Sequence, residues 1–309
     1  MNSSFGALVA LSFALLGVVS CQPRHACDQG CSHTNQIATT DKLFPADPKG
    51  HLFIIGGGDR PDSLLQRYLG LAGEEARVVV LPFASGYPDE TGEYQASEFK
   101  RLGAKESIYL YCSKDSLDSP ERLAAIESAN AIFFSGGDQE RLANYLRGTK
   151  MLDKVRDLYA RGGVVGGTSA GAAVMSQICI TGKEKLVSPV IPEDSLRQHV
   201  YIKHKQMFVV EGFGFLRSVI IDQHFNMRKR LNRLISVMLD YPPLKGIGID
   251  EATAIIVYPD ATFEVAGHSS VFVIEHTTDC PTITVDKNGY QGVRDMKISL
   301  LLAGERGEL

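Results

Sequence analysis

The sequence predicts a doubly wound α/β fold with a mostly parallel sheet and a β-rich C-terminal portion. Between residues 51 and 165, short apolar runs rich in β-branched or aromatic residues alternate with helix-like stretches. These runs are apolar throughout, as in parallel strands that are covered on both faces. Beyond about residue 245, brief turns separate several strand-like runs, as in antiparallel hairpins.

The strand-like runs follow one another in a regular order along the chain. In the first half they are 51–55, 77–83, 107–112, 131–134 and 162–165, and a helix-like segment beginning near Pro61 separates the first two. In the last part they read IGID, TAIIVYP, TFEVAG and SVFVIE. No repeat of fixed period is visible. The chain length allows one large domain or two ordinary ones, and we expect residues 50–309 to form a single α/β domain.

Composition narrows the classes of function. The 309 residues include 32 basic and 36 acidic side chains, giving a formal net charge of −4, and 44% are apolar. This profile is typical of a globular protein. A general nucleic-acid binder would show a clustered basic excess, so a small or peptide-like substrate fits the chain better.

The N-terminal residues predict export. Residues 1–20 carry an apolar core from Phe5 to about Val19, which is short for a membrane span and typical of a signal peptide, although no Lys or Arg precedes it. The string ending in Cys21 is similar to a bacterial lipoprotein box, and residues 21–49 then form a tether. We expect a membrane-anchored lipoprotein facing the periplasm or the cell exterior, with plain secretion as the alternative.

A Gly-rich turn at residues 166–173 contains the candidate nucleophile, Ser169. An apolar strand ends in two glycines, the serine follows, and an Ala-rich helical segment begins. Small neighbours permit the sharp strand-to-helix turn of a nucleophile elbow, and the spacing matches G-x-S-x-G. The alternative is a structural turn in which the serine only caps the helix.

A second polar string follows an apolar run at about residues 219–221. It contains Asp222, Gln223, His224, Arg228, Arg230 and Arg233. A histidine at a strand end beside acid, amide and guanidinium groups favours a polar, cationic cleft suited to carboxylates. Taken alone, the histidine is compatible with a structural role, and the basic run with a solvated helix face.

At these two strings the chain resembles the cyanophycinases of serine peptidase family S51. The resemblance is carried by residues 166–172 (GGTSAGA), 222–234 (DQHFNMRKRLNRL), 136–139 and 246–254 (GIGIDEATA), and it extends from about residue 50 to the C-terminus. It implies a fold related to class I glutamine amidotransferases and hydrolysis of cyanophycin, an arginyl-polyaspartate, to β-Asp-Arg dipeptides. The family also contains dipeptidases that act on N-terminal aspartate, which generally lack the multi-arginine string.

The resemblance also implies a catalytic triad. Ser169 would be the nucleophile, His224 the general base and later acid, and Glu251 the carboxylate that orients His224. Asp250 competes with Glu251 for that role, but neighbours in a strand face opposite sides, so only one of them can point at the imidazole. We expect the other, Asp250, to be a surface or hairpin carboxylate.

Further residues are expected around the triad. The Ala170 amide and an amide of the turn at Gly137 would stabilise the oxyanion. Gln139 and Gln223 resemble substrate-binding residues of the family, and turn capping is the alternative for Gln139.

The three arginines suit the carboxylate groups of such a substrate. Arg230 and Arg233 are the first choices for binding a carboxylate, with Arg228 third. Asp222 is the candidate partner of the substrate arginine, and an internal partner of one of the three arginines is the alternative.

The sequence is also compatible with two other classes of function. A glutamine-amidotransferase-like domain would need cysteine at the elbow, where Ser169 stands and Cys179 lies about ten residues too far along. A catalytically silent surface protein that binds Asp/Arg-rich peptides is the other alternative. No cofactor or metal is implied, because His199 and His204 lack zinc-helix spacing, and the glycines at 56–58 indicate a substrate-pocket turn rather than a phosphate loop. A homodimer is left open.

Overall fold

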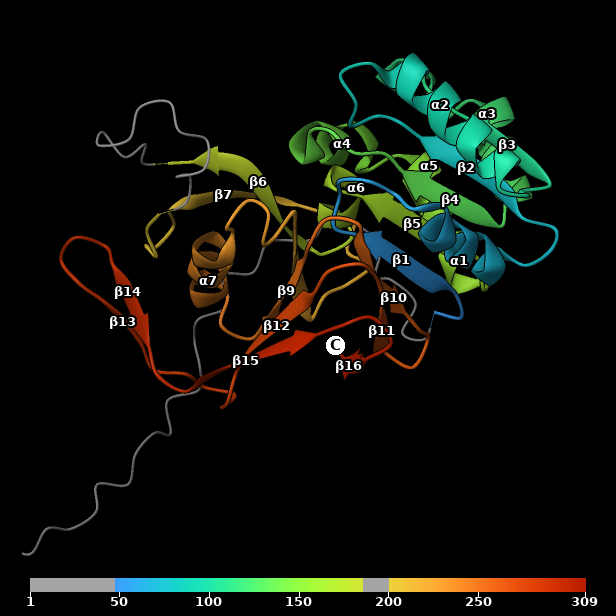
Figure 1. Cartoon of the computed structure of the whole chain (residues 1–309). Helices are drawn as coiled ribbons and strands as arrows, with labels where there is room; N and C mark the ends of the chain where they lie inside the picture. The colour runs from blue at the N-terminus through green and yellow to red at the C-terminus, as the bar shows by residue number, and fades with distance from the viewer. Residues whose placement is uncertain (1–47, 186–199) are drawn as a thin grey trace, which may run out of the picture. The chain divides into compact units, whose positions relative to one another are not determined.

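An eight-stranded sheet forms the centre of the part of the chain described by the computed structural model, residues 48–185 and 200–309. Its strand order is β16-β11-β10-β1-β5-β4-β2-β3 (Figure 1). The bounds are β1 His51–Ile55, β2 Arg77–Leu81, β3 Glu106–Tyr109, β4 Ala131–Phe134, β5 Val164–Thr168, β10 Thr253–Val257, β11 Thr262–Gly267 and β16 Arg306–Glu308. The first five strands pair in parallel, and the three C-terminal strands extend the sheet antiparallel. The predicted α/β class is confirmed.

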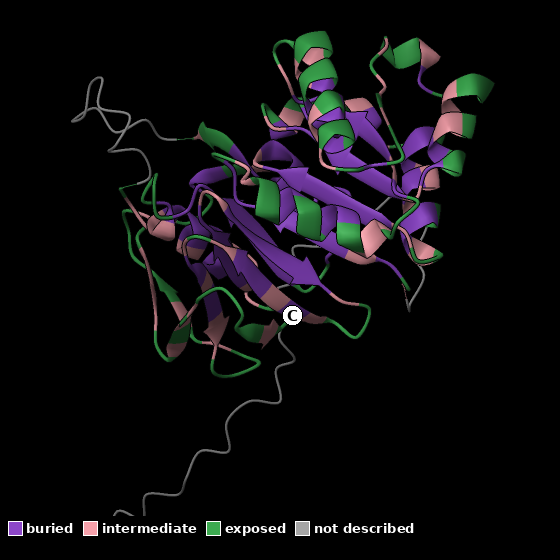
Figure 2. Ribbon diagram, turned by 45° about the vertical axis from the view of Figure 1, so that its right-hand side comes forward, coloured by how far each residue is buried: buried purple, intermediate pink, exposed green. Residues whose placement is uncertain are grey.

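Helices cover both faces of this sheet, which explains its continuously apolar strands. Side chains of α1 (Asp62–Ala72) and α2 (Pro88–Arg101) pack on one face with Phe53, Val80 and Phe133. On the other face lie α3 (Pro120–Ser128), α4 (Gln139–Leu146), α5 (Lys150–Ala160) and the short α6 (Ala170–Ala173). Figure 2 shows the buried strands beneath helices whose outer sides are exposed.

A second sheet packs against that other face. It contains β8 (Val219–Gln223), β9 (Lys245–Ile249), β12 (Val271–His276) and β15 (Met296–Leu301) in the order β15-β12-β9-β8. Its outer side packs against α7 (Leu231–Asp240) and the pair β6 (Ile178–Glu184) and β7 (Met207–Glu211). A small hairpin of β13 (Ile283–Val285) and β14 (Gln291–Val293) completes the described strands.

The hairpin expectation for the C-terminal strands is correct only in part. β10 and β11 pair antiparallel as expected, whereas β9 and β10 lie in different sheets. The chain crosses from one sheet to the other through Asp250, Glu251 and Ala252. Both strands are buried apolar runs, and such a run does not specify which partner it will pair with.

Several expectations from the sequence concern residues that the structure does not describe. These are the signal peptide, Cys21, nearly all of the tether and His199. Among the described residues, no helix is long and apolar enough to cross a membrane.

Candidate active site

Ser169 lies at the carboxyl end of β5, in a backbone conformation that L-residues rarely adopt. Its φ is 53° and its ψ is −109°, and its N–H donates to Ile55 O at 3.0 Å. The turn needs small neighbours, because a Cβ on Gly167 would lie 2.5 Å from Gly171 O. Since α6 has only four residues, its dipole is small, and its contribution is the free amide of Ala170 at its first position.

Two neighbouring strand ends bring an imidazole and a carboxylate to this serine. Ser169 Oγ lies 2.9 Å from His224 Nε2, and His224 Nδ1 lies 2.5 Å from Glu251 Oε1. His224 follows β8, and Glu251 lies on the crossing between β9 and β10. The three side chains therefore form one continuous hydrogen-bonded chain, although 55 and 27 residues separate the bonded pairs.

The glycine turn after β1 packs directly behind this chain. His224 N–H donates to Gly56 O at 2.7 Å, and a Cβ on Gly57 would lie 2.4 Å from the imidazole. A Cβ on Gly58 would lie 2.7 Å from the Glu251 side chain. Sequence reasoning missed this supporting role and assigned the turn to the substrate pocket. The signal was present, since three consecutive glycines after a buried strand indicate a close approach of other groups.

The environment of His224 favours its neutral form. Burial lowers the pKa of His224, the hydrogen bond that its Nδ1–H donates to Glu251 opposes this shift, and the charges of Arg228 and Arg230 lower the pKa further. At neutral pH Nε2 is therefore free to accept a proton from Ser169, because the carboxylate holds the N–H at Nδ1.

Asp222 and Arg233 form an ion pair inside the protein. Arg233 Nε donates to Asp222 Oδ2 at 2.7 Å, its Nη2 bonds Oδ1, and both side chains are 1% exposed. Burial alone would raise the pKa of Asp222, but the charge and hydrogen bonds of Arg233 outweigh it and lower the pKa. This geometry corrects the expectation for Arg233 and favours the alternative given for Asp222. Arg233 is not open to a substrate carboxylate, and Asp222 is the internal partner of an arginine.

The charges of the other two arginines act on the His224 imidazole. Arg230 is 8% exposed, and its Nη1 donates to Gln223 O at 2.6 Å and also to Gln223 Oε1. Burial and the neighbouring guanidinium of Arg233 lower the pKa of Arg230 to about 9, so the group stays charged at neutral pH. Arg228 is exposed on the turn between His224 and α7. It is the most accessible of the three cations, although sequence reasoning ranked it third.

The turn after β4 also lies next to Ser169. A Cβ on Gly136 would lie 3.3 Å from Ser169 Cβ, and one on Gly137 would lie 2.1 Å from Ala84 O. Gln139 begins α4 and is 7% exposed, and its amide nitrogen donates to Ile180 O at 2.9 Å. This donor therefore ties the start of α4 to β6, a contact that differs from the turn capping expected as the alternative. Gly137 and the Ala170 amide both lie on turns next to Ser169.

Asp250 is placed differently from the expected surface carboxylate. It is 7% exposed, and its Oδ1 accepts from the N–H groups of Asn226 and Met227, each at 3.1 Å. Ser269 Oγ donates to its Oδ2 at 2.8 Å. Asp250 and Glu251 point to different groups, although both lie on the crossing between β9 and β10 and not in a strand.

Cys179 does not approach the elbow as a competing nucleophile. It is fully buried on β6, and burial raises the pKa of its thiol far above the usual range. A cysteine of this kind stays protonated and unreactive.

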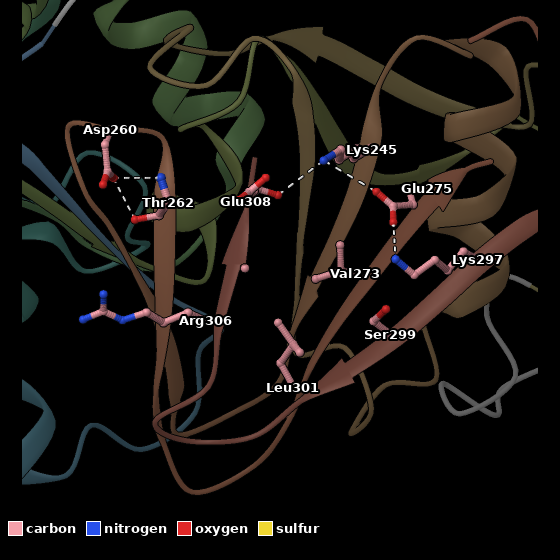
Figure 3. Close-up of a pocket in the computed structure, with 11 residues that line it drawn as sticks. Lys245, Asp260, Thr262, Val273, Glu275, Lys297, Ser299, Leu301, Arg306 and Glu308 are labelled. Carbon is pink, nitrogen blue, oxygen red and sulfur yellow. Dashed lines mark hydrogen bonds and ion pairs between the residues drawn. The ribbon is translucent and has the colours of Figure 1, made fainter. Parts of the chain in front are cut away.

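A separate hollow of about 590 Å³ lies between β11 and β16 on one side and β12 and β15 on the other (Figure 3). Glu275 bonds Lys297 at 2.9 Å and lies 3.5 Å from Lys245, the first residue of β9. Glu251 follows the opposite end of β9, so this hollow is distinct from the Ser169 site.

Comparisons with known proteins found a matching family and similar named relatives. Residues 52–265 match the family described as Peptidase family S51. A protein from Geminocystis herdmanii named cyanophycinase is 32% identical over 74% of this chain and 81% of its own length. A second cyanophycinase, from Trichormus variabilis, is 32% identical over 89% of this chain and 90% of its own length.

Among solved structures, a peptidase from an acI-B1 Actinobacterium has a similar fold. Its TM-score is 0.59 at 22% identity, and the match covers 85% of this chain and 98% of that one. The family match and the relatives together establish that the chain is a serine hydrolase of peptidase family S51.

Proposed function

We propose that this peptidase hydrolyses cyanophycin to β-Asp-Arg dipeptides through a Ser169–His224–Glu251 triad. The observation that carries the proposal is the hydrogen-bonded chain from Ser169 Oγ to Glu251, with the positive charges of Arg228 and Arg230 acting on its imidazole. A guanidinium group binds a carboxylate strongly, and such a substrate has a terminal carboxylate near the bond to be cleaved. The relatives named cyanophycinase support this choice of substrate.

In the proposed reaction, Ser169 Oγ attacks the peptide carbonyl while its proton passes to His224 Nε2. Glu251 stabilises the resulting imidazolium and keeps the ring in place. The amides of Ala170 and Gly137 are the proposed oxyanion donors, each worth on the order of 3 kcal/mol in the transition state. His224 then protonates the leaving amine, and water hydrolyses the acyl-enzyme with the same base.

A substrate comparison tests this function. Purified protein is incubated with cyanophycin, with β-aspartyl dipeptides and with casein, and products are identified by mass spectrometry. Release of β-Asp-Arg from cyanophycin without casein digestion is expected. Cleavage of β-aspartyl dipeptides alone would assign a different substrate, and comparable casein hydrolysis would contradict the specificity.

Active-site labelling separates an enzyme from a silent binding protein. A fluorophosphonate should modify Ser169 and no serine in the Ser169→Ala variant, because only an activated hydroxyl reacts readily. Binding of the polymer without labelling or turnover would support the binding-protein alternative.

We also propose that the chain is exported and lipidated at Cys21, on the pattern of residues 1–21. Detergent-phase partitioning of the full chain and of its Cys21→Ala variant, each produced in a bacterial host, tests this. Equal partitioning of the two into the aqueous phase would contradict lipidation.

A further inference from the structure

The turn between His224 and α7 carries Arg228 and is conformationally strained. His224 and Lys229 have φ values of 49° and 51°, in the left-handed region that disfavours residues other than glycine. Such strain persists only where surrounding groups hold the backbone in place. Two backbone bonds within the turn, Arg228 N to His224 O and Lys229 N to Asn226 O, are both 3.0 Å long.

The middle of this turn is held from outside by one carboxylate. Asp250 Oδ1 accepts from both Asn226 N and Met227 N, and Oδ2 accepts from Ser269 Oγ. Because both oxygens are engaged and the side chain is 7% exposed, the carboxylate has a fixed orientation. Asn226 Nδ2 also donates to Ser270 Oγ at 3.1 Å, which ties the turn to the same neighbouring loop.

His224 has supports of its own. Its N–H bonds Gly56 O, its ring bonds Glu251, and the N–H of the next residue, Phe225, donates to Ile249 O at 3.3 Å. The bonds to Asp250 therefore act further along the turn, on the two residues that immediately precede Arg228.

We propose that Asp250 is the positioning residue of the substrate-binding turn and holds Arg228 where it meets a substrate carboxylate. The inference rests on the proposed function of the same site. One crossing between the two sheets then serves both parts of the reaction, with Glu251 orienting the base and Asp250 orienting the cation. Loss of Asp250 weakens substrate binding more than it slows the chemical step.

The test compares Asp250→Ala with wild-type protein in steady-state kinetics on a defined oligomer of β-Asp-Arg. We expect KM to rise at least about tenfold while kcat stays within about threefold. In an Arg228→Ala background, the Asp250→Ala change should raise KM no further, because the two residues act as one unit. Equal multiplication of KM in both backgrounds, or a fall in kcat with KM unchanged, would overturn the proposal.

Hydrogen exchange supplies a readout that does not depend on the substrate. Peptides covering residues 225–230 should exchange faster in Asp250→Ala, and those covering β1 should not. Unchanged exchange at 225–230 would also overturn the proposal, whereas a wild-type protein that does not cleave the oligomer would contradict only the proposed function. If Asp250→Ala does not fold, Ser269→Ala, which frees Oδ2, should shift KM and exchange in the same direction by less, and no shift would overturn the proposal.

Asp286 offers a matched control. Its Oδ1 likewise accepts two backbone N–H groups, from Asn288 and Tyr290, each at 2.8 Å, in the turn between β13 and β14. Asp286→Ala should speed exchange in that turn and leave KM unchanged. A KM rise equal to that of Asp250→Ala would show that the effect is not specific to the Arg228 turn, which would overturn the proposal.

Discussion

Gly57 leaves no room for a side chain against the imidazole of His224, because an added Cβ would lie 2.4 Å from the ring. Gly57→Ala should therefore push the ring away from Ser169. A displacement of about 1 Å costs on the order of 10²-fold in rate, so kcat should fall by at least that much. Steady-state kinetics on the substrate, together with circular dichroism to verify folding, measures this.

Gly73→Ala is the matched control for that substitution. Gly73 also has a positive φ, 83°, but an added Cβ would meet nothing within 4 Å. Both variants should lose about 1–3 kcal/mol of stability from positive-φ backbone strain, and Gly57→Ala should lose more because of the clash, yet only Gly57→Ala should lose activity. Similar kinetics in the two variants would show that the glycine turn does not hold His224 in its place beside Ser169.

The proposed triad predicts strongly non-additive losses. Ser169→Ala and His224→Ala should each reduce kcat by about 10⁴- to 10⁶-fold, and the double variant should be no worse, because triad members act as a unit. Glu251→Gln should cost up to about 10⁴-fold, since the amide no longer stabilises the imidazolium. Rates are best measured by dipeptide release at high enzyme concentration. If Glu251→Gln kept full kcat while Asp250→Asn lost it, the third member would be wrongly assigned.

The acid limb of the pH profile should report His224. Because burial and the two arginines lower its pKa below the ordinary value of a histidine, kcat/KM should persist into mildly acidic solution and fall only as the imidazole becomes protonated. Removing a nearby positive charge favours the imidazolium, so Arg228→Gln should raise the pKa and move the limb to higher pH. Arg228→Lys keeps the charge and should leave the limb in place. A limb at unchanged or lower pH in Arg228→Gln would contradict this electrostatic coupling.

Some features of the site followed from the sequence because local chemistry decides them. The strands at 51–55 and 131–134 were predicted with their observed bounds, and small residues around Ser169 made the sharp turn predictable. The separate partners of β9 and of β10 were not predictable, because burial of an apolar run says nothing of its partner. The role expected for Arg233 was wrong for a similar reason. A guanidinium has the same sequence signature whether it meets a substrate or an internal carboxylate, and only folding brings Asp222 within reach.

Asp222 should matter for stability more than for recognition. Removing one partner of a buried ion pair leaves an uncompensated charge, so Asp222→Ala should lower the free energy of unfolding by about 3–5 kcal/mol, as measured by urea denaturation. Arg228→Gln, on the exposed turn, should change it by less than about 0.5 kcal/mol. Since the pKa of Asp222 is lowered in the folded state, its contribution is present above the unfolded pKa and disappears as the pH falls through the folded one. If Asp222→Ala left stability unchanged but raised KM strongly, Asp222 would instead be a substrate-binding residue.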